Sequence, residues 1–247
     1  MLPPSSIIIT GSNSGLGKFL CGKFSSIYDN VIGIDKNNAI TNEENELANF
    51  IGVCCDLTKA EAVESSINEV LVKELNPVVL INCAGIIHNE LIYNFLDRKN
   101  SRHSSVHWQN VLESNLTSTF LITREIAAHW VKKRISGKII NISSICARGN
   151  IGQSAYSSAK AGIEAFTKTL SKELAPFGIR TNCIAPGFID TESTRNSLGE
   201  KKLNQIIQQI PLRRLGEASE IFSAANFLIQ NEYINGAILP VDGGMSL

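Results

Sequence analysis

Residues 6–17 read SIIITGSNSGLG, so an apolar, β-branched run passes directly into a turn that contains three glycines. The run predicts a buried strand, and the spacing of apolar residues from Leu16 onward predicts a helix. Glycines at such a junction let the backbone approach a pyrophosphate, and the helix N-terminus offers that anion free N–H groups and partial positive charge. The spacing G-x-x-x-G-x-G is a variant of the dinucleotide-binding fingerprint. We therefore expect a dinucleotide to contact Gly11, Ser12, Asn13, Ser14, Gly15, Leu16 and Gly17.

The same alternation of short apolar run and helical pattern continues along the chain. The expected strands are Ser6–Thr10, Val31–Asp35, Phe50–Cys55, Val78–Cys83, Lys138–Ile142, Ile179–Ile184 and Ala237–Val241. The expected helices are Leu16–Tyr28, Lys59–Leu75, Val106–Arg134, Ala155–Ala175 and Glu217–Gln230. Apolar strands without strict alternation are typical of a parallel sheet covered on both faces. The predicted fold class is α/β: a single Rossmann-type domain over residues 1–247, with a doubly wound parallel sheet of about seven strands and helices on both faces.

Two connections depart from this alternation. Residues 36–49 are short and polar, which predicts a helix of only a turn or two. Residues 88–105 form a long polar stretch that follows a strand and precedes a helix. Loops at that place in open α/β sheets commonly border the active site, so we expect this stretch to influence the choice of substrate.

Composition excludes several classes of function. The 247 residues contain 23 Lys and Arg and 23 Asp and Glu, so the chain has no net charge to attract nucleic acid or an anionic membrane. No apolar run approaches the ~18 residues of a membrane span, and the first residues lack the pattern of a signal peptide. The six cysteines form no C-x-x-C pair. We expect a reduced, cytoplasmic protein that binds neither nucleic acid nor membrane.

Polar residues follow three of the expected strands, at the edge where such sheets bind ligands. Asp35 can accept hydrogen bonds from ribose hydroxyls and would repel a 2′-phosphate, which favours NAD over NADP as cofactor, although Lys36 is a nearby cation. Asp56 and Leu57 follow the third strand, where Asp56 either contacts the cofactor, caps the next helix, or does both. The fourth strand ends in the candidate cofactor residues Asn82, Ala84 and Gly85.

Tyr156 and Lys160 are the most specific signal for chemistry. Four residues apart on an expected helix, they lie on one face. A nearby ammonium favours the phenolate, so we expect Lys160 to lower the pKa of Tyr156 from its usual value of about 10. The strand Lys138–Ile142 ends in Ser143 and Ser144, either of which can donate a hydrogen bond to a substrate oxygen. Asn115 lies within a helix despite its low propensity, which indicates a role in binding water or backbone.

These segments together resemble the short-chain dehydrogenase/reductase family over essentially the full chain. The resemblance rests on TGSNSGLG, NCAG, the Asn115 segment, NISS, YSSAK, IAPGFIDT and the ending RLGEASEI…PVDGG. It is greatest with the 3-oxoacyl-carrier-protein-reductase-like and the sugar- or hydroxysteroid-dehydrogenase-like members. The resemblance is specific for fold and cofactor and unspecific for substrate.

The resemblance implies a role for each matching residue. Tyr156 is the acid/base, Lys160 holds the nicotinamide ribose, and Asn115 holds a water that links Lys160 to solvent. Ser144 orients the carbonyl oxygen when the serine is counted from the strand, whereas counting back from Tyr156 selects Ser143. The residues implied to flank the nicotinamide carboxamide are Pro186, Gly187, Ile189 and Thr191. Two further departures are a thiol at Cys83 and a segment before Asn115 that is roughly eight residues longer than in compact members.

The sequence therefore predicts an oxidoreductase that transfers a hydride between NAD(H) and a small alcohol or ketone. Alternatives are a nucleotide-sugar epimerase or dehydratase, against which the short segment after Thr191 argues, and a dinucleotide sensor without turnover, against which the intact Tyr156–Lys160 pair argues. Small residues along the helix Ala155–Ala175 suit close contact between helices, and the resemblance implies that subunits pair through this helix, so we expect a homodimer or homotetramer. The histidines show no metal-binding spacing with one another or with carboxylates, so we expect no metal site; they are His88, His103, His107 and His129.

Overall fold

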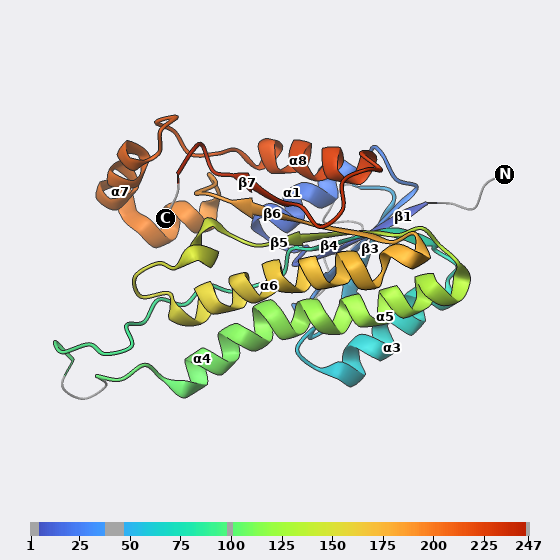
Figure 1. Cartoon of the computed structure of the whole chain (residues 1–247), viewed down its shortest axis with the longest axis horizontal. Coiled ribbons are helices and arrows are strands. Elements are labelled where there is room, and N and C mark those ends of the chain that lie inside the picture. Colours follow the sequence, from blue (N-terminus) through green and yellow to red (C-terminus); the bar gives the residue numbers. More distant parts are fainter. Residues whose placement is uncertain (1–4, 38–46, 98–100, 246–247) are drawn as a thin grey trace.

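The computed structural model describes residues 5–37, 47–97 and 101–245, and these form a parallel sheet with the strand order β3-β2-β1-β4-β5-β6-β7 (Figure 1). The strands are β1 Ser6–Thr10, β2 Asn30–Asp35, β3 Phe50–Cys54, β4 Pro77–Asn82, β5 Lys138–Ile142, β6 Arg180–Pro186 and β7 Ile238–Val241. Every neighbouring pair is parallel. The predicted α/β class, with a doubly wound parallel sheet, is confirmed.

The strand order reverses between β1 and β4. From β1 the chain first builds outward through β2 to β3, then returns to place β4 on the other side of β1. At such a switch point the connections leave in opposite directions, which opens a crevice beyond the carboxyl ends of the strands. The sheet therefore positions the ends of β1 and β4 as the walls of a ligand site.

Helices cover both faces of the sheet (Figure 1). One face packs against α1 Gly15–Phe24 and α8 Ala218–Gln230, which bury Phe24 and Leu228 among strand residues. The other face packs against the remaining long helices, which bury side chains such as Ile67 and Trp130. These helices are α3 Ala60–Val72, α5 Ser118–Lys133 and α6 Ser154–Glu173. Successive side chains of a strand point to opposite faces of the sheet, and helices cover both faces, which accounts for the continuous apolar runs in the sequence.

The remaining elements lie around the carboxyl edge of the sheet or in its connections. They are α4 Ser105–Leu112, the π-helical turn η1 Glu113–Thr117, the 3-10 turns η2 Ile145–Arg148 and η3 Ala175–Phe177, and α7 Glu192–Gln209. The expected single helix Val106–Arg134 is thus interrupted by a π-turn at Asn115. Helix α7 was not predicted, because its first half is polar and Gly199, at φ 66°, breaks its regularity. The expected short helix within residues 36–49 lies mostly outside the described residues.

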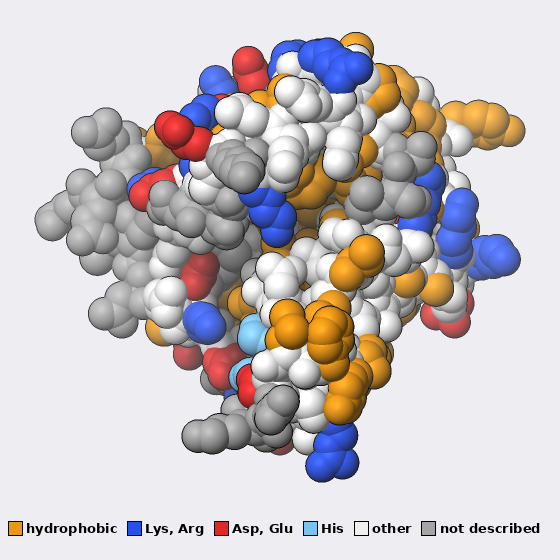
Figure 2. Space-filling view, turned by 90° about the vertical axis from the view of Figure 1, so that its left-hand side faces the viewer, with side chains coloured by type: hydrophobic (Ala, Val, Ile, Leu, Met, Phe, Trp, Pro, Cys, Tyr) orange, Lys and Arg blue, Asp and Glu red, His pale blue; other side chains and the backbone are white. Residues whose placement is uncertain are grey.

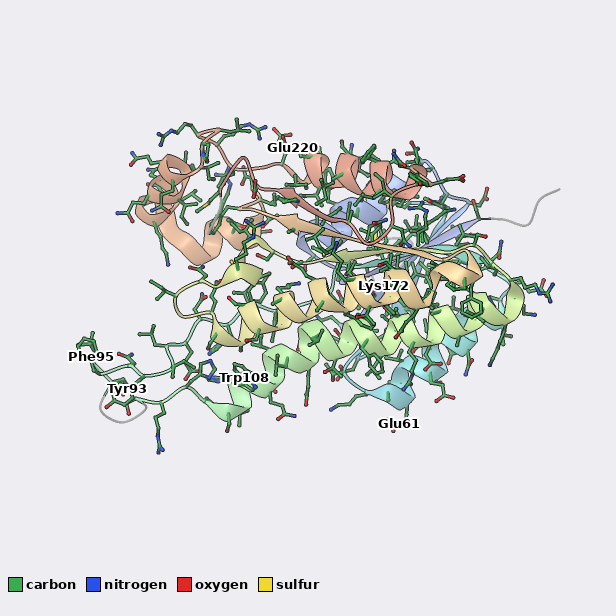
Figure 3. All side chains as sticks on the ribbon, in the orientation of Figure 1. Glu61, Tyr93, Phe95, Trp108, Lys172 and Glu220 are labelled. Atoms are coloured by element: carbon green, nitrogen blue, oxygen red, sulfur yellow. The ribbon has the colours of Figure 1, made fainter. Side chains whose placement is uncertain are left out.

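The long polar stretch after β4 projects from one end of the molecule. It folds back on itself through an antiparallel bridge between Tyr93 and Arg102, and it touches the turn before α6 through a bridge between Glu90 and Gln153. Tyr93 and Phe95 are 62% and 76% exposed at its tip (Figure 3). Figure 2 looks onto this end and shows apolar side chains gathered beside histidines. Among the described residues, no helix is long and apolar enough to span a bilayer.

Candidate active site

A cleft of about 500 Å³ lies at the switch point between β1 and β4. The glycine-rich turn forms one wall, the ends of β2 and β3 form the second, and the segment after β4 forms the third. Of the predicted cofactor residues, the cleft is lined by Gly11, Asn13, Ser14, Gly15, Leu16, Gly17, Asp35, Asp56, Leu57, Ala84, Gly85 and Thr191. The structure therefore brings most of the predicted set to one site.

The glycine-rich turn is shaped by close backbone approaches. A Cβ on Gly17 would lie 2.0 Å from the Gly11 carbonyl oxygen, so only glycine lets α1 begin against this turn. Gly11, at φ 70°, likewise leaves no room for a Cβ beside Ala84. Ser14 gives α1 no side-chain cap, which leaves the first N–H groups of the helix directed at the cleft without a capping side chain. Such a helix start is suited to bind a phosphate.

Asp35 lies at the end of β2, with both carboxylate oxygens accepting backbone hydrogen bonds. Oδ2 accepts from Asn13 N at 3.1 Å, and Oδ1 accepts from Asn37 N at 3.2 Å. These bonds fix the carboxylate beside the glycine-rich turn, where it lines the cleft together with Lys36. An Asp at this place presents negative charge to whatever occupies the far end of the cleft.

Asp56 organises the turn that follows β3. Its Oδ1 accepts from Thr58 N at 3.0 Å and from Thr58 Oγ1 at 2.7 Å, and these bonds lower the pKa of the carboxyl group. Helix α3 begins after Lys59, without a side-chain cap. Asp56 thus stabilises the turn and does not cap α3. Its exposed carboxylate lines the cleft beside the buried Leu57.

Besides the acid/base pair, five predicted cofactor residues do not line the cleft. Asn82 lies behind it, where its Nδ2 donates to Thr123 Oγ1 at 3.0 Å and to Asn141 Oδ1 at 2.8 Å. We therefore attribute the presence of an amide side chain at Asn82 to this buried network and not to contact with a ligand. The other four are Ser12, which is buried under the turn, and Pro186, Gly187 and Ile189, which lie at or just after the end of β6.

Tyr156 lies in the first turn of α6, and only 8% of it is exposed. The Ser144 side chain, two residues after the end of β5, lies near the Tyr156 hydroxyl and acts to lower the pKa of Tyr156. Ser143 points elsewhere: its Oγ donates to the Lys160 carbonyl at 3.2 Å and lies 3.0 Å from Glu164 Oε1. The geometry therefore joins Ser144, counted from the strand, to Tyr156.

Lys160 is buried one helical turn after Tyr156. Its Nζ donates to the Ile142 carbonyl at 2.8 Å and lies 5.5 Å from the centroid of the Tyr156 ring. A Cβ on Gly85 would lie 3.7 Å from this Nζ and 2.3 Å from Asn115 Oδ1. Because Gly85 also lines the cleft, Lys160 and the cleft adjoin at this residue.

Asn115 owes its place to the π-turn. The turn frees the Val111 carbonyl, which accepts from Asn115 Nδ2 at 2.9 Å, and the same amide nitrogen donates to the Ile86 carbonyl at 2.9 Å. Its Oδ1 is fully buried and has no hydrogen-bond partner among the described residues. A buried polar oxygen of this kind is suited to bind an ordered water.

The pKa of Tyr156 differs from the sequence expectation. Burial raises it above its usual value near 10, a nearby Cys146 adds to the rise, and the Ser144 side chain opposes it. Burial also lowers the pKa of the Lys160 ammonium group. The apolar cover comes partly from Ile206 of the unpredicted helix α7 and from Ile210 directly after that helix.

Two features of the site were missed in the sequence. Thr10 Oγ1 accepts from Cys83 N and Ala84 N, both at 3.0 Å, and so fixes the end of β4 to β1. The threonine that precedes the glycine-rich turn was its only signal. The arrangement of the histidines was also missed: His88, His103 and His107 all lie within 3.5 Å of one oxygen of Glu90. The sequence showed no metal-binding spacing for these histidines, and the structure brings three of them to one carboxylate because the projecting stretch folds back on α4.

Comparison with known proteins agrees with this architecture. Residues 12–246 match a family described as enoyl-(acyl carrier protein) reductase. The 3-oxoacyl-(acyl-carrier-protein) reductases of Buchnera aphidicola and Aquifex aeolicus are 37% and 39% identical, with 96% of both chains covered in each case. A solved structure of a putative gluconate dehydrogenase from Agrobacterium tumefaciens superposes with a TM-score of 0.88 at 26% identity, covering 98% of this chain and 95% of that one.

The chain belongs to the short-chain dehydrogenase/reductase family. Within that family it is an NAD(P)-dependent oxidoreductase that acts on CH–OH or C=O groups.

Proposed function

We propose that this enzyme interconverts a carbonyl compound and its alcohol by hydride transfer with NAD(H), using Tyr156 as the acid/base. The observation that supports the proposal is the position of Tyr156: it lies near Ser144 and one turn from the Lys160 ammonium, beside a cleft with a helix start suited to bind a phosphate. A bound nicotinamide ring would supply or accept the hydride.

The cleft fits a dinucleotide in size and in chemistry. About 500 Å³ is within the usual range of small-molecule sites. The start of α1 would hold the pyrophosphate, and Asp35 would accept hydrogen bonds from the adenosine ribose. Because a carboxylate repels a 2′-phosphate, Asp35 favours NAD(H), whereas Lys36 on the same wall is the residue that would favour NADP(H).

Four residues of the chain have separate roles in the proton transfer. In the direction of reduction, the neutral phenol of Tyr156 donates its proton to the carbonyl oxygen, and Ser144 Oγ donates a hydrogen bond to that same oxygen. Lys160 stabilises the phenolate that remains. A water on Asn115 Oδ1 would return a proton from solvent by way of Lys160, since Gly85 brings these two groups together.

The surroundings of Tyr156 favour a substrate that is apolar beside its carbonyl group. The ring lies in a cluster with Ile145, Ile206 and Ile210, against which Phe188 packs. The relatives named above are reductases of 3-oxoacyl groups carried by a protein, so a 3-oxoacyl thioester is the first substrate to test.

The decisive test compares the unaltered enzyme with Tyr156→Phe. NADH absorbance is followed with 3-oxoacyl thioesters, apolar ketones and keto sugars, and NADH affinity is measured by fluorescence titration. We expect Tyr156→Phe to bind NADH nearly normally and to lose turnover. Retained turnover would place the acid/base elsewhere, and a chain that binds NADH but reduces nothing would instead be a dinucleotide sensor.

A further inference from the structure

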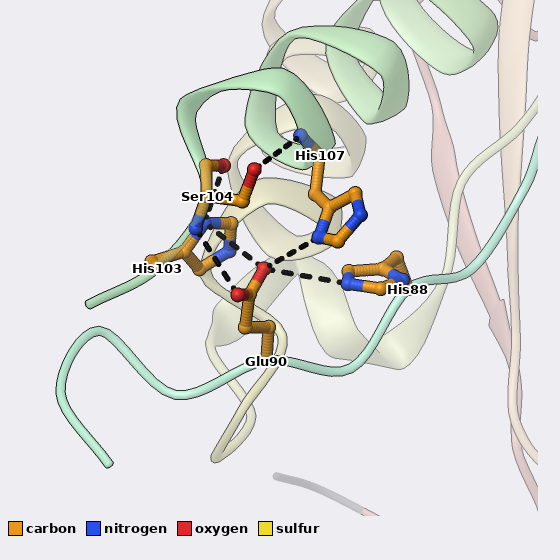
Figure 4. A network of polar contacts seen from close by, with 5 residues as sticks. All are labelled: His88, Glu90, His103, Ser104 and His107. Atoms are coloured by element: carbon orange, nitrogen blue, oxygen red, sulfur yellow. Dashed lines mark hydrogen bonds and ion pairs between the residues drawn. The ribbon is translucent and has the colours of Figure 1, made fainter. Parts of the chain in front are cut away.

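Three histidines meet one carboxylate at the base of the projecting stretch, outside the dinucleotide cleft (Figure 4). Glu90 Oε2 lies 3.0 Å from His107 Nδ1, 3.3 Å from His88 Nε2 and 3.5 Å from His103 Nδ1. None of these residues takes part in the chemistry proposed above. Of these three contacts, the one with His107 is a hydrogen bond, and the convergence of imidazole nitrogens on one carboxylate oxygen is the arrangement to be explained.

The separations match those around a small cation. Donor atoms around a tetrahedral zinc lie about 3.3 Å apart, given metal–ligand distances of about 2.0 Å. The ligand atoms of His88, Glu90 and His107 all lie within 4.8 Å of one another, and the two imidazole rings are 4.2 Å apart between centroids. Two imidazoles and a carboxylate on three sides of one point are a ligand set typical of zinc.

Local structure holds each ligand in place. His88 and Glu90 are two residues apart in the segment after β4, and the His88 Nε2 and Glu90 Oε2 atoms lie 3.3 Å apart. His107 lies in the first turn of α4, whose start is capped by Ser104. These ligands come from the two ends of the projecting stretch, so an ion would fasten the start of the stretch to the helix.

A second set of contacts orients the carboxylate. Ser104 N donates to Glu90 Oε1 at 3.1 Å, which leaves Oε2 directed at the histidines. The His103 side chain is 8% exposed, and its Nδ1 lies 3.0 Å from the Ser104 carbonyl oxygen. The same nitrogen lies 3.5 Å from Glu90 Oε2 and helps to hold the carboxylate in place. Outer contacts of this kind are characteristic of metal sites, where they fix the ligand geometry.

The cluster is also accessible. Glu90, His103 and His107 line a cavity of about 1140 Å³ at this end of the molecule, through which a hydrated cation can reach the ligands. With two neutral imidazoles and one carboxylate, a divalent ion leaves the site with a single positive charge and an open fourth position for water.

We propose that His88 Nε2, Glu90 Oε2 and His107 Nδ1 bind a zinc ion that fastens the projecting stretch to α4. Glu90 N also donates to the Gly152 carbonyl at 2.7 Å, four residues before Tyr156. The ion would therefore hold the stretch against the turn that leads into the acid/base helix, and its role is structural rather than catalytic.

The test uses the full-length protein after treatment with a chelator. Zn²⁺ affinity is measured by competition with a chromophoric chelator, and Co²⁺ is added as a spectroscopic probe of the ligands. We expect one Zn²⁺ per chain, no comparable affinity for Mg²⁺, which prefers oxygen ligands, and a Co²⁺ spectrum without thiolate charge-transfer bands. His88→Ala, Glu90→Gln and His107→Ala should each lose at least about tenfold in affinity.

Two controls separate this site from other donors. His129→Ala removes a histidine on α5, outside the cluster, and Cys54→Ser removes the exposed thiol; both should keep the affinity of the unaltered protein. NADH titration of every variant checks that the cleft is intact. The proposal is overturned if the unaltered protein binds no Zn²⁺, or if binding survives in all three ligand variants.

Discussion

Replacing Gly17 with alanine should strongly weaken dinucleotide binding in the cleft, while most of the sheet stays intact. The added Cβ would lie 2.0 Å from the Gly11 carbonyl oxygen and 2.7 Å from its carbonyl carbon. Both neighbours are backbone atoms, so no side chain can rotate away. The start of α1 must therefore move away from the glycine-rich turn, and the N–H groups that would hold a phosphate move with it.

The size of the effect follows from that contact. Real Cβ contacts are essentially never shorter than 3.0 Å, so the 2.0 Å contact must lengthen by at least 1.0 Å. Overpacking of a rigid site costs about 1–3 kcal/mol, and a backbone displacement of this size belongs near the upper end. About 3 kcal/mol corresponds to a loss of roughly 100-fold in cofactor affinity or in the folding equilibrium.

Helix α1 supplies its own control. A Cβ added to Gly22 would meet no atom within 4 Å, so Gly22→Ala should be neutral or stabilise the helix by about 0.5–1 kcal/mol. NADH fluorescence titration gives the affinity of each variant, and urea unfolding gives its stability. If Gly17→Ala binds NADH as the unaltered enzyme does and unfolds at the same urea concentration, the close approach of α1 to the turn is not what shapes the cleft.

Three further predictions concern chemistry. Ser144→Ala should lower kcat by roughly 10²-fold. Ser143→Ala should instead lower the free energy of unfolding by about 1 kcal/mol and change kcat little. If steady-state kinetics show the larger loss of kcat in Ser143→Ala, the two serines were assigned the wrong way round. We expect the unaltered enzyme to bind NADH about tenfold or more tightly than NADPH, and Asp35→Ala should reduce that ratio of affinities. Tighter binding of NADPH by the unaltered enzyme would contradict this reasoning. Burial raises the pKa of Tyr156, and reduction uses the protonated phenol, so a pH profile of kcat/KM for reduction should not fall until the pH exceeds about 10. A decline near neutral pH would show that another group controls the reaction.

The sequence predicted the sheet well because each strand is a short apolar run that needs no information from elsewhere in the chain. It also predicted many of the residues that border the cleft, since the carboxyl ends of parallel strands meet at one edge. Helix α7 escaped prediction because its early residues are polar and Gly199 interrupts it. That omission explains a second one: Ile206 and Ile210 help to bury Tyr156, so its raised pKa could not be foreseen without α7.

The histidine cluster was invisible for a different reason. His88 and His107 are nineteen residues apart, and the bridge between Tyr93 and Arg102 is what folds the intervening stretch back. No periodic pattern in the sequence encodes that bridge. Local spacing can reveal a metal site on one helix or one turn, but not one that a long connection assembles from its two ends.

The π-turn at Asn115 also ties the length of this helical run to its function. Removing one residue from Glu113–Thr117 would let the backbone continue as a regular α-helix, because a π-turn accommodates one residue more than an α-helical turn does. Ile122, Ile126 and Trp130, all now buried, would then keep their places against the sheet. The core would thus accept a single-codon deletion here, and the cost would fall on the Asn115 amide, which the π-turn places against the Val111 and Ile86 carbonyls.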